Sequence, residues 1–125
     1  MKQFNVEKGR RGEEIAAEHL RAKGYRIIET NHRTRFGEID IICKSPRKGG
    51  GRSAVFVEVK TKVGEDFGTP EEMISKKKLW QVERTAEMYL LGNPTKLSVR
   101  IDAVCIVFDK GGEVARITHY ENMTG

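Results

Sequence analysis

The chain has 125 residues, a length that predicts one domain spanning residues 1–125. Its 23 Lys and Arg residues outnumber its 18 Asp and Glu residues, so the formal net charge is +5 and the sequence pI is near 9.3. This balance favours a polyanionic partner, although many small bacterial proteins are basic without one. The longest apolar run, 103–108, is too short to span a membrane, which excludes a membrane-spanning helix.

Residues 1–11 lack the apolar stretch of a secretory signal. The two cysteines, Cys43 and Cys105, lie inside strand-like apolar runs and are expected to be small core residues in a reducing compartment. We therefore expect a cytoplasmic protein with no membrane partner.

Periodicity and turn residues predict, in chain order, a helix, three strands, a helix and two strands. The second helix should break near Ser75, after a Thr-Pro-Glu-Glu capping box at 69–72. The fourth strand is apolar on both faces from residue 103 and should be central, whereas the fifth should lie at an edge. The predicted ranges are 7–23, 25–29, 38–44, 54–61, 69–91, 98–108 and 113–120. This order indicates an α/β fold, a mixed β-sheet flanked by helices.

Two of the predicted strands carry acidic residues where a buried strand is usually apolar. A hairpin closed symmetrically around residue 49 would place Asp40 directly opposite Glu58. Side chains alternate along a strand, so Lys60 should share the face of Glu58, and Asp40 should lie on the face opposite Ile39 and Ile41. Buried charges are costly unless they are paired or coordinated, and facing carboxylates suit Mg²⁺. An ammonium beside them suits an anionic substrate.

A third acidic candidate lies in the first helix. Glu13 is in phase with the apolar stripe of that helix, at Ala16, Ala17 and Leu20, whereas Glu14 points away from it. Glu13 should therefore face the core and Glu14 should face water. The alternative is that Glu13 is an ordinary acidic residue favoured near a helix N-terminus.

The pattern Asp-(x)n-Glu-x-Lys, here Asp40, Glu58 and Lys60, is the signature of restriction-endonuclease-like nucleases. Five ordered segments together resemble the YraN family (UPF0102), small bacterial proteins related to archaeal Holliday-junction resolvases. The segments are Gly-Arg-Arg-Gly-Glu at 9–13, Gly-Tyr-Arg-Ile-Ile at 24–28, Arg-Phe-Gly-Glu-Ile-Asp at 35–40, Phe-Val-Glu-Val-Lys-Thr-Lys at 56–62 and Arg-Ile-Asp-Ala-Val at 100–104. The chain departs from the family in a longer loop at 44–53 and in His32 and Thr34, which stand where Trp and Cys are usual.

The resemblance implies a restriction-endonuclease-like fold, a Mg²⁺- or Mn²⁺-dependent endonuclease and, by kinship with resolvases, a homodimer acting on branched or junction DNA. It implies that Asp40, Glu58 and Glu13 are both catalytic residues and metal ligands. It adds the carbonyl of Val59 as a ligand. Lys60 would orient the attacking water or stabilise charge at phosphorus.

Basic residues near these motifs are expected to hold the nucleic acid. Three lysines at 76–78 lie where a helix that starts at Ser75 disfavours cations, a cost that phosphate contact would offset. The alternative is an ordinary solvated helix face. The residues expected to contact nucleic acid are Arg33, Arg35, Lys62, Lys78 and Gln81.

Other polar and aromatic residues are expected to be structural. Few aromatic residues interleave with the basic ones in sequence, so base stacking has little support, and Trp80 should pack inside. Asp102 should pair with Arg100. The three histidines are scattered and lack the spacing of a zinc site.

Three functions follow from different readings of these residues. The favoured reading is a metal-dependent endonuclease acting on DNA phosphodiesters. The second is a nucleic-acid-binding module that keeps the fold with little or no activity, which the facing carboxylates argue against. The third is an unrelated basic interaction protein, which the five ordered segments argue against.

Overall fold

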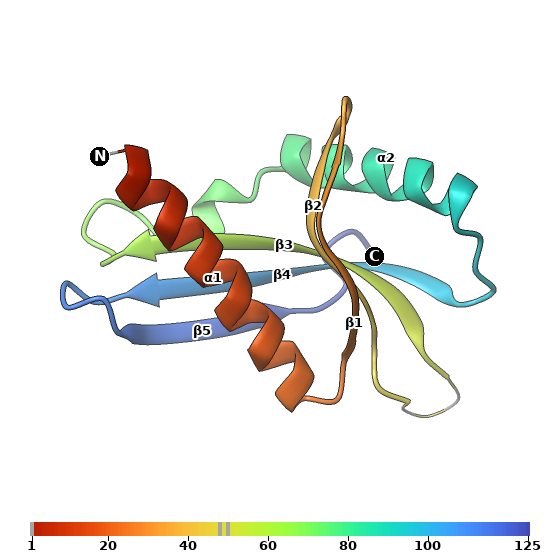
Figure 1. Cartoon of the computed structure of the whole chain (residues 1–125), viewed down its shortest axis with the longest axis horizontal. Coiled ribbons are helices and arrows are strands. Elements are labelled where there is room, and N and C mark those ends of the chain that lie inside the picture. The colour runs from red at the N-terminus through yellow and green to blue at the C-terminus, as the bar shows by residue number, and fades with distance from the viewer. Residues whose placement is uncertain (1, 48, 50) are drawn as a thin grey trace.

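The computed structural model describes residues 2–47, 49 and 51–125, and their side chains from residue 9 onward. These residues form two α-helices, a short 3-10 helix and five strands (Figure 1). The elements are α1 (Lys2–Ala22), β1 (Arg26–Thr34), β2 (Gly37–Lys44), β3 (Ser53–Val63), η1 (Glu71–Met73), α2 (Lys76–Gly92), β4 (Ser98–Phe108) and β5 (Val114–Tyr120). No helix in these described ranges is long and apolar enough to cross a membrane.

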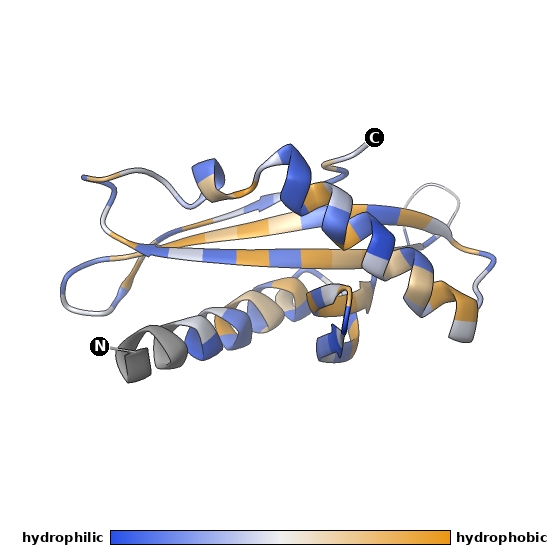
Figure 2. Ribbon diagram, turned by 90° about the horizontal axis from the view of Figure 1, so that it is seen from above, coloured by the Kyte–Doolittle hydropathy of each residue, from blue (hydrophilic) through white to orange (hydrophobic). Residues whose placement is uncertain are grey.

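The five strands form one mixed sheet in the order β1-β2-β3-β4-β5. Strands β3 and β4 are parallel, and the other neighbouring pairs are antiparallel. Helix α2 makes the crossover between the two parallel strands, as parallel pairing requires. Helix α1 covers one face of the sheet and α2 the other, so the molecule has three layers (Figure 2). The predicted α/β fold is therefore confirmed, with a central β4 and an edge β5.

The ends of the predicted elements differ from the structure most in α1 and β1. Helix α1 begins at Lys2 rather than at residue 7, and β1 runs to Thr34 rather than stopping at Glu29. The added part of β1 is polar, and strand propensity gives no signal there. It becomes a strand because it pairs with the start of β2, from Thr30 opposite Ile41 to Thr34 opposite Gly37.

The break in the second helical segment is found where it was predicted. The Thr69 hydroxyl accepts from the Glu72 amide and the Glu72 carboxylate accepts from the Thr69 amide, both at 3.3 Å, which closes the capping box on η1. Helix α2 then starts afresh, because the Ser75 hydroxyl accepts from the Lys78 amide at 3.1 Å as its N-cap.

Each face of the sheet buries its own apolar cluster. The cluster under α1 includes Ile41, Val57 and Val59, and the cluster under α2 includes Phe56. Ile39, expected on the side of Ile41, lies instead in the α2 cluster. The prediction was wrong there because β2 has left β3 by residue 39, and the twist of the free hairpin turns Ile39 toward α2.

The sheet forks between β2 and β3. The two strands pair only from Ile41–Val57 to Lys44–Ala54, beyond which β3 continues beside β4 to Val63. The β1–β2 hairpin meanwhile turns steeply away from β3, β4 and β5 (Figure 1). Its tip packs on α2 so closely that a Cβ on Gly37 would come within 3.0 Å of the Thr85 hydroxyl. This fork holds the candidate site.

Candidate functional site

Asp40 and Glu58 lie at the fork and are almost fully buried, with 7% and 3% of their surfaces exposed. Ile41 pairs with Val57 and Ile42 with Phe56, so the predicted hairpin register is confirmed, and its continuation sets Asp40 opposite Glu58. The strands no longer pair there. Instead, Asp40 Oδ2 accepts a hydrogen bond from the Val59 amide at 2.8 Å. The fork therefore brings two carboxylates together without a backbone ladder between them.

The carboxylate of Glu58 is only partly compensated by its surroundings. Its Oε1 lies 3.6 Å from Lys60 Nζ and 3.7 Å from Lys78 Nζ. Its Oε2 is buried and has no hydrogen-bond partner among the described residues. Burial, followed by the charge of Asp40, raises the pKa of Glu58 to about 7, despite the two nearby lysines. An orphaned buried carboxylate oxygen normally requires a partner that protein atoms do not supply.

The pKa of Asp40 is also raised, first by burial and then by the negative charge of Glu38. The hydrogen bond from Val59 and the charges of Lys78 and Lys60 oppose this rise. Two neighbouring carboxylates that both resist ionisation form a site of excess negative potential, which a cation would relieve.

Glu13 reaches the same fork from α1. It is half-buried while Glu14 is exposed, as the helical phase predicted. Burial and then the charge of Asp40 raise the pKa of Glu13, so Asp40 acts on Glu13 and on Glu58. Helix α1 can approach because residue 12 is glycine: a Cβ there would lie 2.4 Å from the Thr61 methyl carbon.

Asn31 is a residue that the sequence analysis missed. It lies opposite Asp40 in the β1–β2 register, between the pairs Thr30–Ile41 and His32–Ile39. Its φ of 53° is a left-handed value that asparagine tolerates better than most residues. A side-chain hydrogen bond with Asn31 lowers the pKa of Glu13, against the effect of burial. The available sequence signal was an asparagine directly before His32, since asparagine favours left-handed backbone values.

The donor set at the fork fits a hard cation in its chemistry. It combines carboxylates, one orphaned oxygen and, from strand geometry, the carbonyl of Val59. The amide and carbonyl of one strand residue point to the same edge, so the Val59 carbonyl faces the fork as its amide does. Oxygen-only ligands of this kind suit Mg²⁺ and Mn²⁺.

A second group of possible ligands lies elsewhere and is already satisfied. Among the described residues, one set of three metal-ligating side chains has donor atoms all within 4.8 Å of one another, namely Asp102, His119 and Glu121. Arg100 donates to both oxygens of Asp102, at 2.9 and 3.0 Å, and His119 Nε2 lies 2.8 Å away. Burial alone would raise the pKa of Asp102, but the hydrogen bonds from His119 and Arg100 hold it below its usual value.

Asp102 is therefore the structural partner of Arg100, as predicted. Nothing in the sequence indicated that His119 would contact Asp102. The fold brings it from β5 to Asp102 on the neighbouring β4, a contact between residues 17 apart in sequence.

The residues expected to contact nucleic acid, together with Lys60, differ in whether they lie at the fork. Lys60 and Lys78 face Glu58 and thus belong to the fork. Arg33 is exposed and pairs with Glu38 at 3.4 Å, and Arg35 lies near the hairpin tip. Lys62 follows on β3, and Gln81 lies on α2, one turn after Lys78.

Trp80 was expected to be packed inside, and this was wrong. Its side chain on α2 is 57% exposed, because the buried stripe of that helix passes through Val82 and Ala86 instead. The position of Trp80 between Leu79 and Gln81 gave no clear signal of its face.

Comparison with known proteins extends these observations. The sequence profile described as "Uncharacterised protein family UPF0102" matches residues 12–106. The chain belongs to the UPF0102 family. This UPF0102 chain is 39% identical over 120 residues to a UPF0102 protein of Syntrophomonas wolfei, covering 95% of this chain and 98% of the relative. It is 45% identical over 105 residues to one of Persephonella marina, covering 83% and 86%. It is 40% identical over 114 residues to one of Thermotoga neapolitana, covering 91% and 94%.

The matched region of this UPF0102 protein begins at Gly12 and ends at Ile106. It thus contains Glu13, Asp40, Glu58 and Lys60 as well as strands β2 and β3, between which the sheet forks.

Proposed function

We propose that this UPF0102 protein is a metal-dependent endonuclease that hydrolyses DNA phosphodiesters at the sheet fork. The observation that carries the proposal is the buried Oε2 of Glu58, which has no hydrogen-bond partner among the described residues, while Oε1 of the same carboxylate lies near two lysines. A site that only bound DNA would gain nothing from buried carboxylates, because they repel phosphate.

The residues that would hold Mg²⁺ or Mn²⁺ are Asp40, Glu58 and the carbonyl of Val59, with Glu13 contributing from α1. When bound, such an ion supplies neutralisation of phosphate charge and a lower pKa for its water. Asp40 is oriented for this role by the Val59 amide. Glu58 is oriented by Lys60 and Lys78, which hold its Oε1 and leave Oε2 for another partner.

Lys60 has a second role in the proposal. Its ammonium lies 3.6 Å from Oε1 of Glu58, and its side chain is one-quarter exposed, so Lys60 contacts both the buried carboxylate and solvent. From this position Lys60 can donate a hydrogen bond to an attacking water or to a non-bridging phosphate oxygen, stabilising the charge that develops there. As a charged lysine it has no lone pair, so it does not serve as a metal ligand.

The preferred DNA belongs to the proposal as well. Kinship with resolvases supports branched or junction DNA as the substrate and a homodimer as the active form, because two copies could cut two strands symmetrically. Sedimentation of the protein with and without a four-way junction tests the dimer.

The test of the function is cleavage by purified protein with Mg²⁺ or Mn²⁺ on linear, single-stranded, flap and four-way-junction DNAs. We expect cleavage by the wild type, and its loss in Glu58→Gln and Lys60→Ala. Glu14→Gln serves as the matched control, because Glu14 is exposed on the other side of α1. If no DNA in the panel is cut, the enzyme proposal fails and a binding module takes its place.

A further inference from the structure

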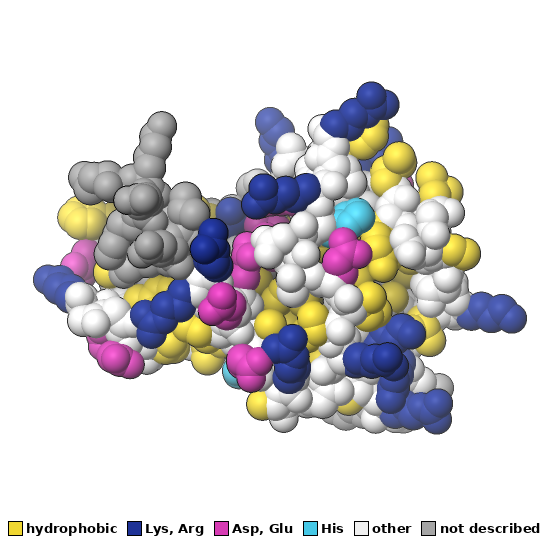
Figure 3. Space-filling view, viewed as in Figure 1, with side chains coloured by type: hydrophobic (Ala, Val, Ile, Leu, Met, Phe, Trp, Pro, Cys, Tyr) yellow, Lys and Arg dark blue, Asp and Glu magenta, His cyan; other side chains and the backbone are white. Residues whose placement is uncertain are grey.

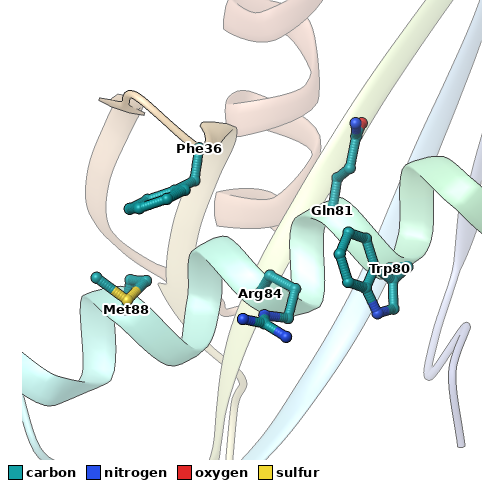
Figure 4. Close-up of a pocket in the computed structure, with 5 residues that line it drawn as sticks. All are labelled: Phe36, Trp80, Gln81, Arg84 and Met88. Atoms are coloured by element: carbon teal, nitrogen blue, oxygen red, sulfur yellow. The ribbon is translucent and has the colours of Figure 1, made fainter.

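An open groove of about 170 Å³ lies beside the fork, between the hairpin tip and α2. Figure 4 shows its lining: Phe36 projects from the hairpin, and Trp80, Gln81, Arg84 and Met88 project from successive turns of α2. The two aromatic rings are 53% and 57% exposed, an unusual exposure for such large apolar side chains. They come from residues 44 positions apart, so the sequence does not reveal that they share one groove.

An arginine guanidinium lies over each of the two aromatic rings in the groove. The guanidinium of Arg84 lies 5.3 Å from the centre of the Trp80 ring, and that of Arg35 lies 5.1 Å from the centre of the Phe36 ring. Lys and Arg side chains also lie beside exposed hydrophobic ones near the top of the β1–β2 hairpin (Figure 3). The groove therefore combines aromatic surfaces with positive charge, which an uncharged protein segment would not complement.

Helix α2 links the groove to the candidate site. Gln81 lines the groove and lies one helical turn beyond Lys78, whose ammonium contacts Glu58. Three residues along a helix correspond to about 4.5 Å. A polymer whose phosphate lies at the fork would thus place its neighbouring unit at the groove.

We propose that this groove binds an unpaired nucleobase of the DNA strand whose phosphate lies at the fork. The base would stack on Trp80 and Phe36, the two arginines would contact the flanking phosphates, and the Gln81 amide would hydrogen-bond the base edge. Aromatic stacking combined with cations is the usual means of binding single strands without sequence preference. The inference rests on the proposed function and refines it, because the substrate would then need an unpaired nucleotide next to the cut, as a flap or an opened junction provides.

Trp80 is the sole tryptophan of the chain, so its fluorescence reports on the groove alone. The test compares the binding of a short thymidine homopolymer with that of an abasic chain of the same length, both in EDTA. Binding is measured by quenching of the Trp80 fluorescence and by the fluorescence anisotropy of the labelled DNA chain. The two chains carry the same phosphates and differ only in their bases. We expect quenching by the thymidine chain alone, and binding about 5- to 150-fold tighter than that of the abasic chain, the range that base–aromatic stacking supplies.

Variants decide whether the groove causes this preference. Trp80→Leu and Phe36→Leu keep an apolar side chain and should reduce the preference for bases, as measured by anisotropy. Phe67→Leu is the matched control, because Phe67 is 96% exposed and does not line the groove. Equal binding of both chains by the wild type, or an undiminished preference in both groove variants, overturns the inference. The binding test is done in EDTA, so its result does not depend on metal-dependent cleavage. If the groove shows no preference for bases but the protein cleaves DNA with Mg²⁺ or Mn²⁺, the inference fails and the proposed function does not.

Discussion

The carboxylate of Asp40 accepts a hydrogen bond from the backbone amide of Val59 at 2.8 Å, just past the point where β2 and β3 stop pairing. This bond takes the place of the missing ladder and holds the hairpin at the mouth of the fork. Asp40 is therefore both a structural link and a proposed metal ligand, and substitutions can separate the two roles.

Asp40→Asn should keep the structural link and lose the metal. The Asn amide oxygen can still accept from the Val59 amide, so unfolding in urea should resemble that of the wild type. Asp40→Ala leaves the amide unsatisfied and should lower the free energy of unfolding by about 1–3 kcal/mol. Calorimetric titration with Mn²⁺ should show binding by the wild type and little by Asp40→Asn. Equal binding by these two proteins would remove Asp40 from the ligand set.

Glu58 should make the metal-free protein less stable as pH rises. The folded protein keeps this proton up to about pH 7, whereas the unfolded chain releases it near the ordinary pKa of 4.5. Between these values the folded state binds more protons, so stability present below pH 4.5 is lost as pH rises through 7, on the order of 3 kcal/mol. Urea unfolding in EDTA at several pH values measures this. In Glu58→Gln the free energy of unfolding should fall less with pH, and at pH 8 this variant should be more stable than the wild type. A wild type whose stability does not fall between pH 4.5 and 8 would contradict the prediction.

Glu13 and its neighbour Glu14 provide a matched pair on one helix. Glu13→Gln removes a carboxylate whose pKa is raised by burial and by Asp40, so it should weaken Mn²⁺ binding and slow cleavage. Glu14→Gln changes an exposed side chain and should leave both unchanged. The opposite ranking in calorimetry and cleavage assays would exclude Glu13 from the site.

Gly12 should be required for the close approach of α1 to β3. Gly12→Ala places a methyl against the Thr61 side chain, which should cost about 1–3 kcal/mol and displace Glu13. Thr61→Ser removes the opposing methyl and should restore most of the loss when combined with Gly12→Ala. Gly9→Ala is the control, because nothing lies within 4 Å of a Cβ there. Urea unfolding of the four variants measures the rescue, and its absence would indicate that the contact does not determine stability.

Lys78 should contribute one phosphate contact to DNA binding. Lys78→Ala should reduce the slope of log affinity against log salt by about 0.9, with little dependence on base sequence. Lys110→Ala, in the exposed turn between β4 and β5, is the control for loss of a positive charge. Anisotropy at several salt concentrations gives the slope. An unchanged slope in Lys78→Ala would mean that the lysine serves only the ion pair with Glu58.

Local pattern was sufficient for the elements whose signals lie close together in sequence. The apolar stripe of α1 set the phase that turns Glu13 inward and Glu14 outward. The symmetric hairpin about residue 49 set the register of β2 and β3. The capping box and Ser75 located the break before α2. In each case the determining residues are within a few turns or one hairpin of each other, so backbone geometry alone relates them.

Other features depend on contacts between distant segments, which no local pattern encodes. The fork exists because β3 stays paired with β4 along its whole length, whereas the start of β2 pairs only with β1. This separation of β2 from β3 turned the side chain of Ile39 to the opposite face of the sheet. The same departure left Glu58 Oε2 without a hydrogen-bond partner among the residues that the structure describes, and it set Asn31 opposite Asp40. Sequence therefore identified the acidic side chains and their spacing. The way the sheet divides around them determined which are buried and which groups they face, because burial and pairing depend on the packing of the whole chain.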